Sequence, residues 1–211
     1  MKIIFATGNK GKLREAAEIL GEGFTLMCPA DLGIIEDIEE TGETLEANSL
    51  IKADYIHART GLDCFADDTG LEVDALGGAP GVHSARYATD GHDFEANIDK
   101  LLAELEKHPG EPRTARFRSV VTLIFGGELH FFEGTLEGVI ASARRGGNGF
   151  GYDPVFIPDC HPEVTVAELD DDAKNAISHR GKALRAMAAW LRAETAGVKC
   201  DGRRGGNGED S

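Results

Sequence analysis

Strand-like and helix-like patterns alternate along the first half of this 211-residue chain, and this order constrains the fold more than any other feature. The isoleucine-rich run Lys2–Ala6 predicts a buried strand. From Lys10 the apolar residues take helical spacing, until Gly21 ends the pattern. The further elements expected in this half are a strand at 24–28, a helix at 44–60, apolar runs at 64–66 and 71–76, and a helix at 93–107. Strands that alternate with helices indicate a sheet covered by helices.

The second half of the chain instead carries consecutive strand patterns. Strands are expected at 114–125, 128–136 and 138–143, and the Gly126-Gly127 pair fits a hairpin turn between the first two. A last helix is expected at about 179–195. Alternating elements followed by a meander predict an α/β fold around a mixed sheet.

Residues 197–211 differ from the rest of the chain in composition. They hold five glycines and almost no apolar side chains. Such a segment cannot bury enough surface to offset the entropy lost when it becomes ordered. We therefore expect one globular domain over residues 1–196, followed by a disordered glycine-rich tail.

The charge balance argues against several classes of protein. The chain has 22 Lys and Arg against 37 Asp and Glu, a net charge of −15, whereas a general nucleic-acid binder needs a broad basic face. The longest apolar run is far too short to span a membrane, and the N-terminus lacks the apolar core of a signal peptide. The four cysteines show no CxxC spacing and predict free thiols in a reducing compartment. We expect a cytoplasmic globular protein that binds neither nucleic acid nor a membrane.

The segment TGNKGK at 7–12 lies between the first strand and the first helix. Backbone N–H groups at a helix start, glycines that let a ligand approach and two lysines are together typical of an anion site. The spacing differs from that of a Walker A loop, GxxxxGK[ST]. The alternative is a simple turn with solvated lysines. The candidate phosphate ligands are Thr7, Gly8, Asn9, Lys10, Gly11 and Lys12.

Two adjacent aspartates, Asp67 and Asp68, follow the apolar run at 64–66 and are expected to end that strand. Ligands of open α/β sheets bind beyond the carboxyl ends of strands. Because neighbouring residues of a strand point to opposite faces, only one of the two carboxylates can readily face a given pocket. The alternative is a structural turn made by these aspartates.

An acidic stretch with Glu40 and Glu43 precedes a helix that carries Asn48 and Lys52 on one face. A carboxylate from this stretch together with Asp68 would suit Mg²⁺, which takes oxygen ligands and usually binds with substrate phosphates. The alternative is a solvated acidic loop.

The fourth candidate combines the glycine-rich GGNGFGYDP at 146–154 with Lys174 and the SHR triplet at 178–180. An aromatic ring in a glycine loop can stack on a base. Arginine and histidine can donate hydrogen bonds to a keto oxygen. The alternatives are a core aromatic residue and, for the triplet, a helix start capped by its serine.

These motifs occur together in one order: TGNKGK at 7–12, EETGETLEANSLIKA at 39–53, ADDTGLEVDALGGAPGVHSARY at 66–87, GFGYDPVF at 149–156 and KNAISHRGKAL at 174–184. In this combination the chain resembles, over about residues 1–195, the inosine/xanthosine triphosphate pyrophosphatases, also called XTP/dITP diphosphatases. The resemblance implies an α/β homodimer in which each subunit has an elongated mixed sheet, helices on both sides and two lobes that flank a nucleotide cleft.

The resemblance also implies an activity. These enzymes use Mg²⁺ to hydrolyse the α–β phosphoanhydride of ITP, dITP and XTP. The products are the nucleoside monophosphate and pyrophosphate, and the reaction removes deaminated purines from the nucleotide pool.

Roles for individual residues follow from the same resemblance. Glu40 and Asp68 would hold Mg²⁺, Asp68 would also accept a proton as general base, and Lys52 would take part in catalysis. Whether Asp67 or Glu43 shares the metal or base role stays open. Residues 7–12 would bind the triphosphate. The other substrate contacts would come from Thr69, which stands where the family more often has serine, and from Phe150, Gly151, Tyr152, Asp153, Lys174, His179 and Arg180.

Three other functions are alternatives. A pyrophosphatase of the same fold that acts on pyrimidine triphosphates would differ in its base pocket, and SHR with FGYDP favours the purine branch. A regulator that binds nucleotide without cleaving it is disfavoured by Asp68 and Lys52. A P-loop phosphotransferase does not fit the motif spacing.

Overall fold

A seven-stranded mixed sheet forms the centre of the molecule, in the strand order β2-β1-β3-β5-β6-β7, with β4 paired to β3. The computed structural model describes residues 1–36, 38–91 and 93–201, with side chains up to Ala196. The strands are β1 (Lys2–Phe5), β2 (Thr25–Met27), β3 (Cys64–Val73), β4 (Pro80–Gly81), β5 (Thr114–Phe125), β6 (Glu128–Ile140) and β7 (Phe156–Pro158). The α-helices are α1 (Lys10–Leu20), α2 (Leu45–Thr60), α3 (Phe94–Glu106), α4 (Asp171–Ile177) and α5 (His179–Asp201).

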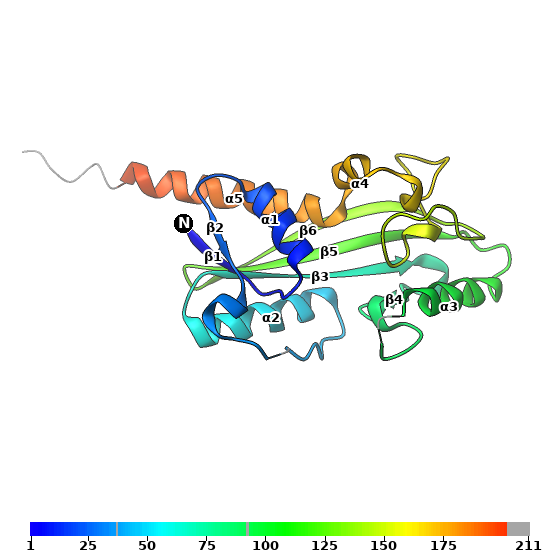
Figure 1. Cartoon of the computed structure of the whole chain (residues 1–211), viewed down its shortest axis with the longest axis horizontal. Helices are drawn as coiled ribbons and strands as arrows, with labels where there is room; N and C mark the ends of the chain where they lie inside the picture. Colours follow the sequence, from blue (N-terminus) through cyan, green and yellow to red (C-terminus); the bar gives the residue numbers. More distant parts are fainter. Residues whose placement is uncertain (37, 92, 202–211) are drawn as a thin grey trace, which may run out of the picture.

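The sheet combines both modes of strand pairing, as the order of the elements predicts. β1 pairs in parallel with β2 and β3, whereas β3, β5, β6 and β7 pair antiparallel in turn. Figure 1 shows β3, β5 and β6 running along most of the elongated molecule, with α1 and α5 on one face of the sheet and α2 on the other. The predicted α/β fold with a mixed, elongated sheet and helices on both sides is confirmed.

Separate hydrophobic cores divide the molecule into two lobes that share the long strands. The first lobe has one core on each face of the sheet, where α1 and α5 cover residues such as Phe65 and α2 covers residues such as Ala66. The second lobe packs α3 and β7 around the end of β3 at Leu71 and Val73. This arrangement agrees with the two lobes that the resemblance implies, and it leaves the middle of β3 between them.

The aspartates at 67–68 do not end a strand, and this expectation is wrong. β3 continues through both of them to Val73, because β5 pairs with it from Cys64 to Val73 and supplies backbone partners throughout. β6 is likewise one strand where two were expected, since it continues past Leu136 to Ile140 against β5 and β7. The functional carboxylates therefore lie inside a sheet and not in a loop beyond it.

Other elements differ from the sequence prediction in extent. The short α4 and β7 were not predicted, because neither is long enough to show a clear hydrophobic period. Helix α5 runs to Asp201, beyond the end expected near Thr195. The remainder of the predicted tail, residues 202–211, lies outside the described residues, so the prediction of disorder there stays a prediction.

Gly134 of β6 lets α5 approach the sheet closely. A Cβ atom at this position would lie 2.7 Å from the backbone nitrogen of Ala183 and would also overlap the carbonyl oxygen of His179. Any larger residue would push the first turn of α5 away from β6. Gly134 therefore determines how closely the start of α5, with His179 and Arg180, packs against the sheet.

The structure bears on the predicted free thiols and on the question of a membrane-spanning helix. Cys28, Cys64 and Cys160 are free thiols, while the side chain of Cys200 is outside the described part. Within the described residues, no helix combines the length and the apolar character that crossing a bilayer requires.

Candidate active site

Three adjoining hollows meet at Lys12, where the two lobes face each other. The largest, about 740 Å³, lies between the lobes and is lined by Lys52, Asp68, Thr69 and Phe150 among others. A second of about 410 Å³ lies beside the 7–12 loop and is lined by Thr7, Gly8, Glu40 and Lys52. A third of about 480 Å³ lies between α1 and the start of α5, lined by Asn9, Gly11, Arg180 and Arg185. Lys12 lines all three hollows, so its side chain is within reach of a ligand in any of them.

The 7–12 loop is shaped by the capping of α1. Asn9 is the N-cap residue, and its Oδ1 accepts hydrogen bonds from the backbone nitrogens of Gly11 (2.8 Å) and Lys12 (3.1 Å). Thr7 Oγ1 accepts a bond from the Asn9 nitrogen at 3.2 Å. Two of the N–H groups expected to bind phosphate are therefore already satisfied. Of the two lysines of this loop, Lys12 is the one that can contact a bound anion, because Lys10 is exposed and lines none of the three hollows.

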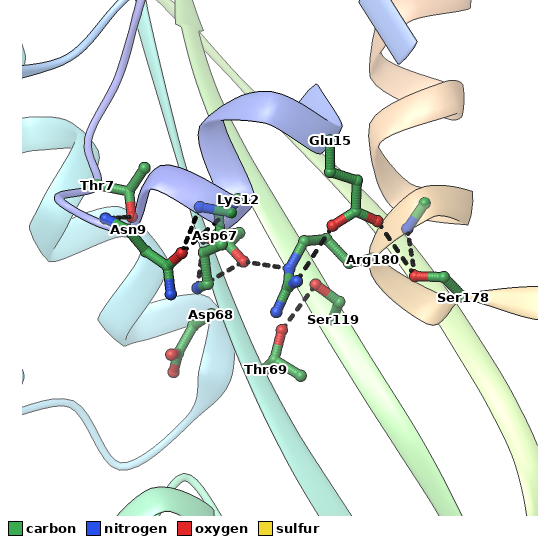
Figure 2. Close-up of polar contacts among 12 residues, drawn as sticks. Thr7, Asn9, Lys12, Glu15, Asp67, Asp68, Thr69, Ser119, Ser178 and Arg180 are labelled. Atoms are coloured by element: carbon green, nitrogen blue, oxygen red, sulfur yellow. Dashed lines mark hydrogen bonds and ion pairs between the residues drawn. The ribbon is translucent and has the colours of Figure 1, made fainter. Parts of the chain in front are cut away.

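Asp67 and Asp68 point to opposite faces of β3, as the period of a strand predicts. Asp67 faces α1 and α5, where it accepts hydrogen bonds from Lys12 Nζ (2.9 Å to Oδ1) and Arg180 Nε (3.0 Å to Oδ2). Figure 2 shows these cations gathered around Asp67, with Asp68 directed away from them. Burial alone would raise the pKa of Asp67, but the positive charges of Lys12 and Arg180 hold it well below its usual range. A carboxylate this firmly ionised and paired is unsuited to accept a proton.

Asp68 has the opposite properties. Its Oδ1 lies 3.3 Å from Lys52 Nζ, while its Oδ2 is buried without any hydrogen-bond partner among the described residues. Burial raises the pKa of Asp68, Lys52 lowers it, and nearby Glu40 raises it again; the net change is upward. A half-buried carboxylate with a raised pKa and an unused oxygen is suited to accept a proton from a water molecule.

Lys52 joins the two acidic residues expected to hold a metal. Its Nζ lies 3.1 Å from Glu40 Oε1 and 3.3 Å from Asp68 Oδ1. Burial would lower the pKa of Lys52, but the charges of Asp68, Asp67 and Glu40 outweigh it and raise that pKa, so the lysine stays charged. The loop that carries Glu40 is tied to α2, because Asn48 Oδ1 accepts a 2.7 Å hydrogen bond from the Gly42 nitrogen.

The donor set at this position fits Mg²⁺. Glu40 and Asp68 offer carboxylate oxygens to one hollow region, and Asp68 Oδ2 is a buried oxygen without a partner in the described chain. No cluster of three or more His, Cys, Asp or Glu side chains occurs among the described residues, so a closed protein cage for a metal is not found there. Mg²⁺ bound with nucleotide phosphates needs only one or two carboxylates and keeps several waters.

The glycine-rich loop presents Phe150 to the hollows and fixes it from behind. Phe150 is 61% exposed, and it lines both the cleft between the lobes and the hollow beside α1. Asp153 Oδ2 accepts bonds from the Phe150 nitrogen (3.0 Å) and from Lys174 Nζ (2.6 Å), and that ammonium lies 4.8 Å from the Phe150 ring centre. Gly149 has φ +84°, and a Cβ there would overlap the Asp153 carboxylate, so the loop requires glycine.

Tyr152 and Asp153 support the loop more than they face a ligand. Tyr152 is buried and lines the cleft, and its hydroxyl donates a 2.9 Å hydrogen bond to the Ser84 carbonyl of the second lobe. Asp153 is buried beneath Phe150. Gly151 lines the cleft beside them. The predicted set at 150–153 is therefore brought together, with Phe150 as its exposed member.

The start of α5 has the predicted cap, because Ser178 Oγ accepts a 3.1 Å hydrogen bond from the Gly181 nitrogen. His179 stacks on Phe117, with ring centres 5.0 Å apart, and its Nδ1 is buried with no partner in the described chain. Burial and the charge of Arg180 lower the pKa of His179 to about 3. The imidazole is therefore neutral at physiological pH. Thr69 lies at the edge of the cleft and donates its hydroxyl to Ser119 Oγ at 3.0 Å.

Glu15 of α1 is a site residue that the sequence reading missed. Its Oε2 accepts a 3.2 Å bond from Arg180 Nη1, and its Oε1 lies 3.3 Å from Ser178 Oγ. Arg180 therefore lies between two carboxylates, those of Asp67 and Glu15 (Figure 2). The only signal in the sequence was its place in the second turn of the helix that follows the 7–12 loop. Glu43, which the sequence left as a possible metal ligand, is exposed and lines none of the three hollows.

Comparison with known proteins agrees with this geometry. A model of the Ham1 family matches residues 3–190. The chain is 51% identical to a dITP/XTP pyrophosphatase of Porphyromonas gingivalis, over 90% of this chain and 97% of the relative. It is 47% identical to one of Bacillus subtilis, over 90% and 96%.

Solved structures show the same fold. A HAM1 protein from Coxiella burnetii, 40% identical, matches with a TM-score of 0.87 over 92% of this chain and 99% of its own. A nucleoside-triphosphatase, dITP/XTP pyrophosphatase, from Mycobacterium abscessus, 45% identical, matches with a TM-score of 0.77 over 90% and 99%. With a family model that spans nearly the whole described chain and relatives this similar over nine-tenths of it, the protein belongs to the Ham1 family.

Proposed function

We propose that this protein hydrolyses non-standard purine nucleoside triphosphates, ITP, dITP and XTP, to the nucleoside monophosphate and pyrophosphate. The observation that carries the proposal is the Asp68 carboxylate in a cleft that also contains Lys12: its Oδ1 pairs with Lys52, and its Oδ2 is buried without a partner among the described residues. The relatives named dITP/XTP pyrophosphatase support the same activity. Removal of deaminated purines from the nucleotide pool would follow from it.

The charges of the site suit attack at the α-phosphorus. Lys12 and Lys52 both line the cleft between the lobes and the hollow beside the 7–12 loop, and they would neutralise the triphosphate. Asp68 would take a proton from water, whose oxygen forms the new bond to the α-phosphorus. The bond from the α-phosphorus to the bridging oxygen breaks, and its electron pair leaves with pyrophosphate. The monophosphate, the pyrophosphate and the proton taken up by Asp68 account for all atoms of the triphosphate and the water, and Asp68 then releases that proton to solvent.

We include Mg²⁺ in this proposal, with Glu40 and Asp68 as its protein ligands. The support is the pair of carboxylates at one hollow region and the preference of Mg²⁺ for oxygen ligands shared with phosphates. When bound, the ion neutralises phosphate charge and polarises the phosphoryl oxygens. Lys52 lies between Glu40 and Asp68. Its positive charge would offset the repulsion between the two carboxylates when Mg²⁺ is not bound.

Base selection is proposed to come from Phe150 and the start of α5. The exposed Phe150 ring offers a stacking surface. Arg180 can donate to the 6-keto oxygen of hypoxanthine or xanthine but cannot accept from the 6-amino group of adenine. A buried donor left unpaired by adenine costs free energy, which favours the keto purines. His179, being neutral, would contribute one ring nitrogen as donor and one as acceptor.

The homodimeric state and the cytoplasmic location are further parts of the proposal. Their support is the resemblance of the motifs at 7–12, 39–53, 66–87, 149–156 and 174–184 to a homodimeric family. Light scattering on the purified protein should give twice the chain mass of 22.5 kDa.

The decisive experiment is a panel of nucleoside triphosphates with and without Mg²⁺, in which pyrophosphate and orthophosphate are measured separately. ITP, dITP and XTP should yield equal amounts of monophosphate and pyrophosphate, only with the metal present, and ATP should react far more slowly. Release of orthophosphate and nucleoside diphosphate would place the attack at the γ-phosphorus and contradict the proposal. Binding of ITP without any product would indicate a nucleotide-binding regulator.

A further inference from the structure

We propose that Asp67 is a positioning residue that links the phosphate side of the site to the base side, by holding Lys12 and Arg180 at the same time. This inference rests on the proposed function and deepens it. The two cations come from different helices, α1 and α5, and Asp67 of β3 is the carboxylate that both contact.

The geometry of the contact is specific. Lys12 Nζ lies 2.9 Å from Asp67 Oδ1 and 2.8 Å from Oδ2, and Arg180 Nε lies 3.0 Å from Oδ2. The lysine thus contacts both oxygens, and the arginine uses the edge of its guanidinium. Because Arg180 Nη1 also bonds to Glu15, the plane of the guanidinium is fixed from two directions. No described residue accepts a hydrogen bond from Arg180 Nη2, which leaves that nitrogen for a ligand.

Asp67 has too little exposed surface to bind a ligand itself. Its side chain is 2% exposed, compared with 23% for Lys12 and 14% for Arg180. A carboxylate would also repel a phosphate. Asp67 itself lines only the hollow beside the 7–12 loop, whereas Lys12 lines all three hollows and Arg180 lines the cleft and the hollow beside α1. Asp67 therefore acts through the two cations that rest on it.

Removing the carboxylate should disturb both sides of the site together. Asn at this position cannot neutralise the two partly buried cations, which would then repel each other and leave their present positions. Lys12 would lose its place at the junction of the hollows, and Arg180 would keep only Glu15. Substitution of a residue that supports only one side of the site would weaken the binding of only one of the two ligands.

The test measures binding of two product-like ligands by calorimetry, without catalysis. Pyrophosphate reports on the Lys12 side, and inosine monophosphate on the Arg180 side. We expect Asp67→Asn to weaken both by about tenfold or more, and Asp67→Glu, which keeps the charge, to recover both to within about threefold. Lys12→Met should weaken mainly the binding of pyrophosphate, and Arg180→Gln should weaken mainly the binding of inosine monophosphate. Asp74→Asn is the matched control, because Asp74 also pairs with an arginine, Arg116, but lies outside the three hollows.

Two double variants keep the test informative if Asp67→Asn alone does not fold. Asp67→Asn with Lys12→Met, and Asp67→Asn with Arg180→Gln, each remove one negative and one positive charge, so the cluster stays balanced. Compared with Lys12→Met alone, the first should bind inosine monophosphate about fivefold more weakly. Compared with Arg180→Gln alone, the second should bind pyrophosphate about fivefold more weakly.

The outcomes separate this inference from the proposed function. If Asp67→Asn, or the balanced double variants in its place, weaken only one ligand or neither, the inference is wrong even when ITP is cleaved as proposed. If the wild-type protein binds both ligands but releases no pyrophosphate from ITP, the proposed function is wrong. The binding data then still decide whether Asp67 links the two sides.

Discussion

The two faces of β3 carry the same residue type at adjacent positions and give it opposite chemistry. On the face of α1 and α5, Asp67 is 2% exposed and held by Lys12 and Arg180. On the face of α2, Asp68 is 14% exposed, meets only Lys52 among the described cations, and has a buried oxygen without a described partner. The first carboxylate is satisfied and fixed, whereas the second is left incomplete. Two identical side chains therefore differ because of the helices that cover each face, which a short motif alone does not reveal.

The largest expected effect is on the incomplete face. Asp68→Asn should lower kcat for ITP by about 10³-fold or more, because an amide neither accepts the proton nor binds the metal well. Thermal unfolding should show an unchanged or higher Tm, since the substitution removes a buried charge whose raised pKa shows that the fold disfavours it. A variant that keeps more than about a tenth of the wild-type rate would mean that another group is the base.

On the face that α1 and α5 cover, a substitution of Asp67 should change the stability of the fold. Asp67→Asn should lower the free energy of unfolding at pH 7 by about 3–5 kcal/mol, because it removes the buried charge that pairs with two partly buried cations. The pKa of Asp67 is lower in the folded than in the unfolded chain, so its stabilisation is present above about pH 4 and is lost only as the pH falls through the folded-state value. Urea titrations at pH 7 and pH 5 should give the same difference from wild type.

Asp74→Asn provides the comparison for that measurement, because its ion pair with Arg116 lies at the surface and should cost at most about 1 kcal/mol. Equal losses for the two substitutions would show that the buried and exposed carboxylates do not differ as described.

The last prediction concerns His179 at the start of α5, and how its protonation changes the stability of the fold with pH. The pKa of His179 is lowered to about 3 by burial and by Arg180, so its ring should stay neutral from pH 8 to pH 5. The unfolded chain takes up a proton near pH 6.5 and the folded chain does not, so the folded state should lose at most about 1.4 kcal/mol per pH unit below that value. NMR of the histidine rings checks the first point. Unfolding of His179→Gln, which should lose less stability on acidification, checks the second.

Much of the fold followed from local pattern. The extents of α1 and α2 were predicted from the spacing of apolar residues and, for α1, from Gly21. The structure adds the caps: Asn9 and Thr44 begin these helices, and Gly21 and Gly61 follow them. The strand 114–125 was predicted with its observed bounds. The error at Asp67 and Asp68 arose because polar residues were taken as a strand end. Whether a strand can continue through two carboxylates depends on β5, Lys12 and Arg180, all distant in sequence.

Most residues predicted for the candidate site line the three hollows, but Lys10, Asp153, Lys174 and His179 line none of them. The alternation of strand residues correctly separated Asp67 from Asp68. The pairing of Arg180 with Glu15 was not predicted, since these residues are 165 positions apart and no local pattern links them. The 7–12 segment was expected to offer free N–H groups, but the side chain of Asn9 occupies two of them. Local reasoning identifies residue types well, but it cannot determine which partners the fold brings to them.

The contact between α5 and β3 has a consequence for the order in which the chain matures during synthesis. Asp67 and Lys12 leave the ribosome long before Arg180, which is 113 residues beyond Asp67. Closing so long a loop is slow relative to forming the local helices. A nascent chain that has folded β1, α1 and β3 therefore holds one wall of the nucleotide cleft without the other. The site is complete only when α5 docks against Gly134. A chain truncated before α5 should therefore be inactive.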